Sequence, residues 1–352
     1  MTKAGHAARP RKKALRMSRS WLMPLLAATL CTAQAAAQPT VTVHNFARAE
    51  TDRYLTDLVR MAGIGRLAHE RAVVDVANQT VIRMNRDTLY SYLVLDLEAG
   101  SALVSMPEVG ARFMSLQAID QDHYVHGVFY APARFVFTRE QVGTRYMVLL
   151  FRTFLDPNDP ADVAAAQAAQ DGIRVEQAAA GRLELPEWDK ASLDAVRAAL
   201  NTLALHGASA AHGFGRRGEV NPIDHVAMAA AGWGGNPQRA AMYLPIVPPA
   251  ALAGAPSRIR LTEVPVDGFW SITMYNAQGF MVANPAHAYS VNNVTAQRAA
   301  DGSVTVQFGG CEAAPPNCLP TPEGWNAMLR LYRPRAALLE GRWQVPPLEP
   351  VR

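Results

Sequence analysis

A short, mostly apolar stretch decides the fold class: Arg145-Tyr146-Met147-Val148-Leu149-Leu150-Phe151-Arg152. Its aliphatic and aromatic side chains, uninterrupted by Gly or Pro, predict a buried β-strand. A similar stretch runs from Asn326 to Arg333 near the other end of the chain. Another pair, Phe113-Met114-Ser115-Leu116 and Phe269-Trp270-Ser271-Ile272, also resemble each other. These similar stretches have two interpretations. They come either from a duplicated β module or from unrelated sandwich strands that share a pattern.

Further short runs of β-branched or aliphatic residues lie on both sides of these stretches. Because Gly, Pro and Asn punctuate the runs, they predict antiparallel strands joined by turns. The runs cover residues 73–76, 81–84, 93–97, 112–120, 135–137 and 145–154, and then 259–261, 269–275, 304–306 and 328–332. We therefore expect a mainly β fold with helical connections, built as two antiparallel β-sandwich or jelly-roll-like domains.

Helices are expected in three places. Apolar residues at helical spacing predict a partly helical segment over 40–65. Asp159-Pro160 supplies an N-cap followed by Pro at the first helical position, which predicts a helix reaching about Ala180. A third helix is expected from Asp189, while the Gly-rich segment 213–237 is expected to be irregular. The predicted domains are 38–158 and 238–352, with 159–237 connecting them.

The charge of the chain is concentrated at its start. Among 352 residues, 49% are hydrophobic and 18% charged, which is typical of a globular protein. Residues 1–37 contain seven Lys or Arg and no Asp or Glu. Without them the net charge changes from +4 to −3. Nucleic-acid binding requires a concentrated basic surface, so it is excluded as an expected function.

The same 37 residues predict a secretory signal peptide. A basic region is followed by an apolar run from Trp21 to Ala33, which is shorter than the ~20 residues of a membrane-spanning helix. Cleavage after Ala37 would give a mature chain that begins at Gln38. Met1 and Met17 are both possible starts of translation. We expect a periplasmic or secreted protein without a membrane span in its mature chain.

Two cysteines remain after removal of the signal peptide. Cys311 and Cys318 flank a turn-forming segment that contains Pro315 and Pro316. In an oxidising compartment this spacing favours a disulfide. Two thiols alone are too few for a structural zinc site, and no metal is expected.

The densest group of functional side chains is Asn85-Arg86-Asp87-Thr88-Leu89-Tyr90-Ser91. In an extended chain, Arg86 and Tyr90 would share one face. The guanidinium could clamp a carboxylate or sulfate, and the tyrosine could stack on a ring or donate its hydroxyl. Gln117 is expected on a neighbouring strand, as a second wall of the pocket. Arg86 and Asp87 could instead form a buried structural pair.

An acid–base site is the alternative. Asp87 or Asp120 could act with His123, and a bent loop could bring these groups together. A solvated polar strand end explains Asp120 and His123 equally well. Dinucleotide and phosphate-binding loops are absent from the sequence, so no cofactor is expected.

Several motifs in order resemble one exported bacterial family. Asn85 to Ser91 and Arg112 to Gln117 resemble domain of unknown function 1254. The motifs of the second half resemble its usual C-terminal partner, domain of unknown function 1214: Gly232 to Gly235, Phe269 to Tyr275, Asn284-Pro285 and Leu329 to Pro334. The resemblance covers about residues 42–350. It implies two jelly-roll-like β domains with helical connections and an exported protein, and it implies no established reaction.

The leading interpretation is a protein that binds a small polar ligand, such as a saccharide or a carboxylated metabolite, through Arg86, Tyr90 and Gln117. A hydrolase or lyase that uses Asp87, Asp120 and His123 is the second interpretation. An envelope assembly protein, with the sandwiches as homo-oligomer interfaces, is the third.

Overall fold

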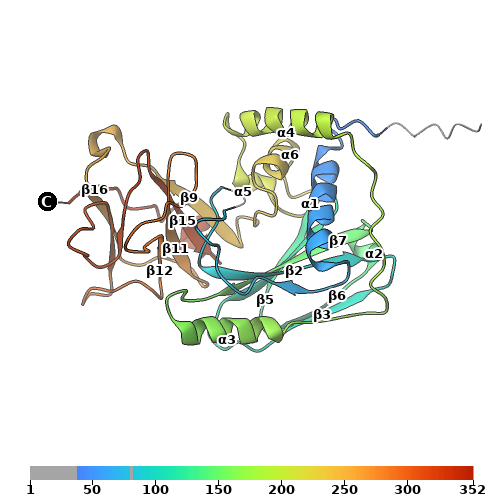
Figure 1. The fold of residues 1–352 in the computed structure, drawn as a ribbon, viewed down its shortest axis with the longest axis horizontal. Coiled ribbons are helices and arrows are strands. Elements are labelled where there is room, and N and C mark those ends of the chain that lie inside the picture. The colour runs from blue at the N-terminus through green and yellow to red at the C-terminus, as the bar shows by residue number, and fades with distance from the viewer. Residues whose placement is uncertain (1–37, 80–81, 352) are drawn as a thin grey trace, which may run out of the picture. The chain divides into compact units, whose positions relative to one another are not determined.

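The fold is mainly β, with helices between and beside the sheets (Figure 1). The computed structural model describes residues 38–79 and 82–351, so the predicted signal peptide at 1–37 lies outside the described residues. Residues 38–352 form one compact unit. Each half of this unit contains two sheets that pack on each other.

The N-terminal half is built around a five-stranded sheet, here called the β7 sheet. Its strand order is β1 (Ala68–His69), β2 (Thr88–Asp96), β7 (Tyr146–Phe154), β4 (Met114–Asp120) and β5 (Val125–Tyr130). One face packs on a smaller sheet of β6 (Ala133–Phe137), β3 (Ala102–Met106) and β8 (Arg174–Gln177). Alternate residues such as Leu93, Leu116 and Leu149 form the core between these two sheets.

Helices cover the other face of the β7 sheet. Val94, Ile119 and Val148 point to that face and pack with Leu55 of α1 (Phe46–Ala62). The helix layer also contains α4 (Lys190–Ala204), α5 (Ala210–Gly213) and α6 (Pro222–Ala231). Two other helices are not part of this layer: α2 (Arg139–Val142), and α3 (Pro160–Asp171), which contacts β2 and β7. The β7 sheet is therefore buried on both faces, which explains why its strands are almost continuously apolar.

The C-terminal half is a second pair of sheets. The β15 sheet has the order β12 (Ser290–Asn292), β11 (Trp270–Tyr275), β15 (Asn326–Tyr332) and β9 (Ala241–Ile246). The β13 sheet has the order β14 (Cys318–Leu319), β13 (Val304–Phe308), β10 (Ser257–Leu261) and β16 (Glu349–Pro350). Short helical turns occur at η1 (Ala250–Leu252) and α7 (Ala336–Leu339). Ile272, Leu329 and Val306 are among the core residues between the two sheets.

The predicted mainly β fold with two antiparallel β domains is confirmed, and several elements differ in detail. The helices after Asp159 and Asp189 form, each with the aspartate as N-cap, but the first ends at Asp171 and not near Ala180, because β8 follows it. Residues 73–76 and 82–84 are irregular or in turns rather than strands, and residue 81 of the second predicted run lies outside the described residues. The segment 213–237 is not wholly irregular, because Asn221 caps α6. The connecting segment 159–237 also contributes β8 to the N-terminal half.

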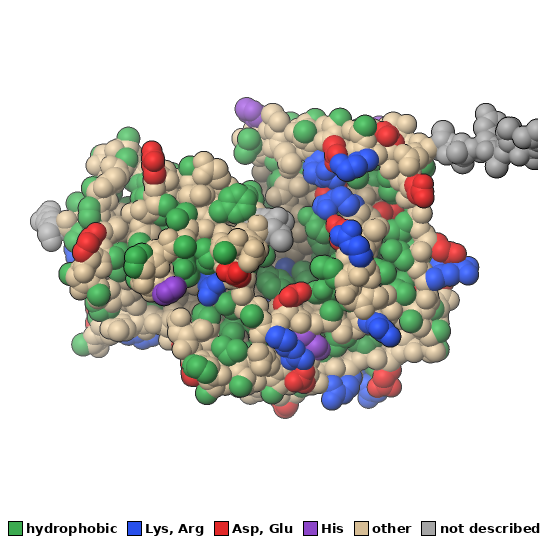
Figure 2. Space-filling model, in the orientation of Figure 1, with side chains coloured by type: hydrophobic (Ala, Val, Ile, Leu, Met, Phe, Trp, Pro, Cys, Tyr) green, Lys and Arg blue, Asp and Glu red, His purple; other side chains and the backbone are tan. Residues whose placement is uncertain are grey.

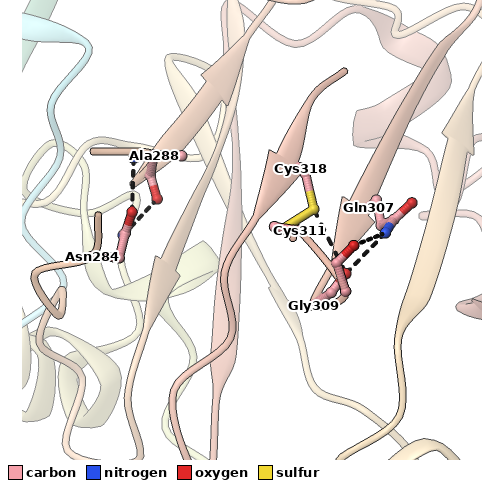
Figure 3. Close-up of a disulfide and its surroundings, with 7 residues drawn as sticks. Asn284, Ala288, Gln307, Gly309, Cys311 and Cys318 are labelled. Atoms are coloured by element: carbon pink, nitrogen blue, oxygen red, sulfur yellow. Dashed lines mark hydrogen bonds between the residues drawn. A yellow bond between two sulfur atoms is a disulfide. The ribbon is translucent and has the colours of Figure 1, made fainter. Parts of the chain in front are cut away.

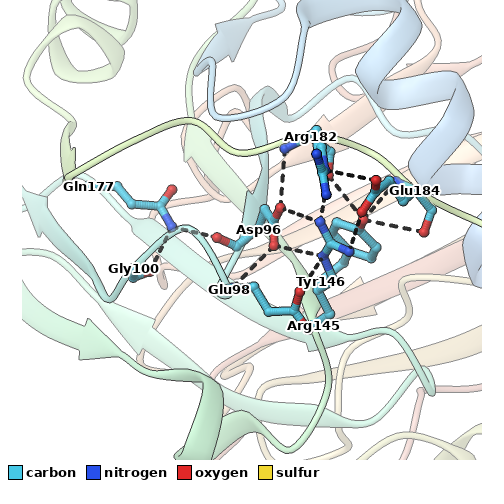
Figure 4. Close-up of polar contacts among 8 residues, drawn as sticks. All are labelled: Asp96, Glu98, Gly100, Arg145, Tyr146, Gln177, Arg182 and Glu184. Atoms are coloured by element: carbon cyan, nitrogen blue, oxygen red, sulfur yellow. Dashed lines mark hydrogen bonds and ion pairs between the residues drawn. The ribbon is translucent and has the colours of Figure 1, made fainter.

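An ion-pair network fastens the extended chain after β8 to the β7 sheet (Figure 4). Arg145 binds Asp96 of β2 at 2.9 Å and Glu184 of the extended chain at 2.7 Å. The hydroxyl of Tyr146 donates to the carbonyl oxygen of Arg182 at 3.0 Å. The segment that leads toward α4 is therefore held by side chains at the start of β7.

The predicted disulfide joins Cys311 and Cys318, with an S–S distance of 2.04 Å. Figure 3 shows it beside β13, where Gln307 donates hydrogen bonds to the carbonyl oxygens of Gly309 and Gly310. Sγ of Cys318 lies 3.6 Å from the carbonyl oxygen of Gly309. The loop is thus closed by the disulfide and supported at its base by an amide side chain.

Candidate functional site

A polar row crosses the otherwise apolar β7 sheet. Arg152 of β7 lies opposite Tyr90 of β2 on one side and opposite Ser115 of β4 on the other. Residues directly opposite in an antiparallel sheet share a face, so the three side chains form a Ser–Arg–Tyr row on the face away from Leu149. Gln117 is two residues beyond Ser115 and shares this face. The row lies at the end of the sheet nearest the C-terminal half.

Arg152 is buried in this row and forms no ion pair with a carboxylate in residues 38–79 and 82–351. It is 5% exposed and donates to Oε1 of Gln117 at 2.7 Å and to the carbonyl oxygen of Gly234 at 3.1 Å. Its guanidinium lies 5.5 Å from the centre of the Tyr90 ring. Burial acts to lower the pKa of Arg152 and nearby tyrosines act to raise it, with a net rise, so the side chain stays charged.

The loop after α6 covers this row. The amide of Gln117 donates to the carbonyl oxygen of Gly235 at 2.8 Å, beside the bond from Arg152 to Gly234. Gly234 has a φ of +77°, and a Cβ at Gly235 would lie 2.3 Å from the ring of Phe214. Glycine is therefore favoured at Gly234 by its left-handed backbone and at Gly235 by the close approach of the Phe214 ring.

The β15 sheet carries a second Ser–Arg–Tyr row. Arg330 of β15 lies opposite Ser271 of β11 and opposite Tyr243 of β9. All three point away from the core of the C-terminal half, because Leu329 and Ile272 face that core. Arg152 and Arg330 therefore occupy equivalent positions in the two sheets, each between a serine and a tyrosine. The two similar sequence stretches, Arg145–Arg152 and Asn326–Arg333, instead align Arg152 with Arg333, three residues away.

Arg330 differs from Arg152 in its surroundings. Its guanidinium donates to the hydroxyl of Thr273 at 3.0 Å, the hydroxyl of Tyr275 at 2.7 Å and the carbonyl oxygen of Arg83 at 2.5 Å. The carboxyl group of Asp87 also acts on it electrostatically. Arg330 thus fastens the chain before β2 to the β15 sheet through three hydrogen bonds.

Asp87 contributes to the same junction. Its Oδ1 accepts a hydrogen bond from the amide of Asn292 on β12 at 3.1 Å. Its Oδ2 is buried and has no hydrogen-bond partner in the described residues, and the same is true of the hydroxyl oxygen of Ser271. Burial raises the pKa of Asp87, and this effect outweighs hydrogen bonds and nearby arginines that lower it. A protonated Asp87 next to Ser271 would relieve the cost of burying the carboxylate.

Three tyrosines from the two sheets lie near Arg152. Tyr90, Tyr243 and Tyr332 are the groups that act electrostatically on Arg152. Burial raises the pKa of Tyr332 well above its ordinary value, so its hydroxyl is neutral at pH 7 and can donate a hydrogen bond. The amide of Asn236 donates to the hydroxyl of Tyr243 at 3.0 Å. Figure 2 shows the surface hollowed between the two halves, with a Lys or Arg side chain visible inside. We call the group of Arg152 and the three tyrosines that act on it the central recess.

Two family models match the chain, one in each half. Residues 64–141 match "Protein of unknown function (DUF1254)", and residues 252–336 match "Protein of unknown function (DUF1214)". The two matches follow each other in that order along the chain. The resemblance to these two domains that the motifs indicated is thereby confirmed. No curated protein matches this chain.

Solved structures share the fold of the DUF1254–DUF1214 chain. The VPA0106 protein from Vibrio parahaemolyticus is 17% identical and has a TM-score of 0.67, covering 88% of this chain and 98% of its own. A putative uncharacterized protein from Burkholderia cenocepacia is 15% identical and has a TM-score of 0.50, covering 87% of this chain and 88% of its own. At these identities the likeness concerns the fold alone.

The structure brings together two of the three predicted ligand-binding residues of this DUF1254–DUF1214 chain. Tyr90 and Gln117 both contact Arg152, although β7 separates their strands, which were expected to be neighbours. Arg86 is elsewhere. Since β2 begins only at Thr88, Arg86 is not on the strand face that carries Tyr90. It donates to the carbonyl oxygen of Val74 and lies 5.1 Å from the ring of Tyr289.

The three predicted acid–base residues do not meet. Asp120 caps the turn between β4 and β5: its Oδ1 accepts backbone N–H bonds from Asp122 and Tyr124, and its Oδ2 is 3.0 Å from Nε2 of His126. His123 is fully buried, and its Nε2 accepts the N–H of Gly234 at 3.0 Å. Asp87 is in the junction with β12. The acid–base mechanism remains a prediction that these contacts do not favour.

Arg152 and Arg330 were not singled out by the sequence reasoning. Their signal is a charged residue inside or at the end of a run that otherwise predicts a buried strand. Within the part of the chain that the structure describes, no three His, Cys, Asp or Glu side chains gather as a metal site. No helix there is long and apolar enough to cross a membrane.

Proposed function

We propose that the protein binds a small carboxylate-bearing metabolite in the central recess, with Arg152 as the anchor. The observation that supports this is a buried, charged guanidinium that bonds an amide oxygen, a backbone carbonyl and the phenol of Tyr90, and forms no ion pair with a carboxylate of the described residues. Burying an unpaired charge is costly, and an anionic ligand would remove that cost. A guanidinium has five N–H donors in a planar fork, which leaves donors for a carboxylate.

The comparison of the two rows supports the assignment. Arg330 has Asp87 nearby and donates to three oxygens of its own surroundings. Arg152 occupies the equivalent register position with no acid beside it in the described chain. The Arg330 row therefore serves as a structural fastening, whereas the Arg152 row is suited to bind an anion.

The tyrosines would select the ligand. The neutral hydroxyl of Tyr332 can donate to a carboxylate oxygen, and the ring faces of Tyr90 and Tyr243 offer apolar contact. A site of this kind requires a ligand with one anionic group and a compact body. It offers no acid–base pair, so binding is favoured over catalysis.

Replacing Arg152 tests the proposal. A panel of small carboxylates, each paired with its neutral amide, is titrated by calorimetry. We expect at least one carboxylate to bind the wild type and its amide to bind far more weakly. Arg152→Gln should weaken the carboxylate by roughly 10- to 100-fold, because charged hydrogen bonds contribute about 1.5–3 kcal/mol. Arg152→Lys, which keeps the charge but loses the fork, should fall between the two.

The matched control is Arg260→Gln, which removes an exposed arginine of β10 that pairs with Asp301. It should bind like the wild type. Thermal unfolding of each variant reports whether the fold is kept. A folded Arg152→Gln variant with wild-type affinity, or a panel in which amides bind as well as carboxylates, would refute the proposal.

We also propose that the chain is exported before it acts. The proposal is supported by the basic and apolar leader that ends at Ala37 and by the Cys311–Cys318 disulfide, which is stable in an oxidising compartment. Mass spectrometry of the expressed protein tests it. A secreted or periplasmic form that begins at Gln38 is expected, and a cytoplasmic form with the leader intact would contradict it.

A further inference from the structure

A second pocket lies where the chain around Arg86 meets the disulfide loop. Its volume is about 440 Å³, a size typical of small-molecule sites. It is lined by Arg86 and Asn158, by Tyr289 and Ser290, and by residues of the 311–318 loop. It is separate from the central recess, because none of Tyr90, Gln117 or Arg152 is among its lining residues.

Arg86 is the only Lys, Arg, Asp or Glu that lines this pocket. The half-buried guanidinium is fixed by the carbonyl oxygen of Val74 and by the ring of Tyr289, 5.1 Å away. It forms no ion pair with a carboxylate in the part of the chain described. A fixed cation in a pocket without acidic residues is complementary to an anion.

Other polar side chains of the pocket are neutral, so they can bind hydroxyl groups of a ligand rather than a second charged group. The side chains of Asn158, Ser290 and Gln297 line the pocket and make no side-chain hydrogen bond within residues 38–79 and 82–351. Amide and hydroxyl groups can each donate and accept, as the hydroxyl groups of a sugar require. The arrangement thus offers one carboxylate position at Arg86 and several hydroxyl positions around it.

The disulfide loop forms part of the wall. Cys311, Pro315, Pro316 and Cys318 line the pocket. Asn317 holds the loop in place, because its amide oxygen accepts the N–H of Gln297 at 2.8 Å and its amide nitrogen donates to the carbonyl oxygen of Gln297 at 2.8 Å. The disulfide would therefore keep this wall in position.

We propose that this pocket binds an acidic sugar of the uronic acid class, with its carboxylate on Arg86 and its hydroxyls on the amide and hydroxyl side chains of the wall. The site is independent of the ligand bound at Arg152. The sugar could be a free uronate or the end of a longer acidic saccharide, and the chemistry recognised is the same in both cases.

Calorimetry with galacturonate, trigalacturonate and galactose tests this inference. We expect galacturonate to bind and galactose, which lacks the carboxylate, to bind at least 10-fold more weakly. Tighter binding of trigalacturonate would identify a chain end as the natural source, and equal affinity would identify the free sugar. Equal binding of galactose and galacturonate, or no binding of either acid, would overturn the proposal.

Variants separate this site from the central recess. Arg86→Gln should lose at least 10-fold in galacturonate affinity, whereas Arg152→Gln should bind it like the wild type. Arg342→Gln, an exposed arginine that pairs with Glu340, is the matched control. Arg86→Lys retains the charge and should keep part of the affinity, which guards against misreading an unfolded Arg86→Gln protein. Unchanged galacturonate binding in folded Arg86→Gln, or its loss in Arg152→Gln, would refute a separate site at Arg86.

Discussion

His123 shows how a single buried residue supports the site. It has a φ of +69°, in the left-handed region, and its Nε2 accepts the N–H of Gly234, the residue whose carbonyl holds Arg152. Trp233, Phe214 and His225 surround the ring. Because Nε2 accepts, the ring proton is on Nδ1, which has no partner in the described residues. His123 is therefore a neutral structural residue that positions the glycine loop.

This neutrality predicts a pH dependence of stability. Burial, together with the nearby His225, lowers the pKa of His123 from 6.5 to about 3. Below pH 6.5 the unfolded chain takes up a proton at this residue and the folded chain does not. The free energy of unfolding should therefore fall as the pH drops from 6.5 toward 3, by up to about 1.4 kcal/mol per pH unit. Urea unfolding between pH 7.5 and 4 measures this slope.

The variant His123→Asn should flatten the slope, since Asn tolerates the left-handed conformation and does not titrate. His206→Asn, which replaces an exposed histidine, should leave the slope unchanged. If His123→Asn kept the full pH dependence of the wild type, another group would be responsible and His123 would not be held neutral.

At the scale of elements, local signals gave most of the fold. The Asp159-Pro160 pair predicted α3, and the same kind of signal at Asn221-Pro222, which caps α6, was overlooked in a Gly-rich segment. The runs at 73–76 and 82–84 have strand-like composition but form no strand, because β propensity depends on a neighbouring strand to pair with.

The candidate site was predicted only in part because strand order is a tertiary property. Nothing local indicated that β7 lies between β2 and β4, and this order alone places Arg152 between Tyr90 and Gln117. The local sequence did identify Tyr90 and Gln117 as polar residues in buried strands. It misplaced Arg86, whose direction depends on where β2 begins.

At the scale of the whole molecule, an aromatic cluster joins the two halves beneath the central recess. Phe269 of the C-terminal half lies 5.1 Å from Phe113 and 4.2 Å from Phe154, both of the N-terminal half, and 4.1 Å from Tyr332. The ring centroids at these separations are packed as in a domain core. The recess between the two Ser–Arg–Tyr rows can keep its geometry only if this cluster holds the two halves together.

We therefore predict that the two halves unfold as one unit and that Phe269→Ala destabilises both, by about 3–5 kcal/mol. Hydrogen exchange of peptides from β7 and from β15 measures the two halves separately. Both should exchange faster in Phe269→Ala, by a similar factor. Phe308→Ala is the matched control, because Phe308 is buried in the C-terminal core against Trp325. In a cooperative unit this control also accelerates exchange in β7. Faster exchange confined to β15 in both variants would mean that the halves unfold independently, and the recess would then open without global unfolding.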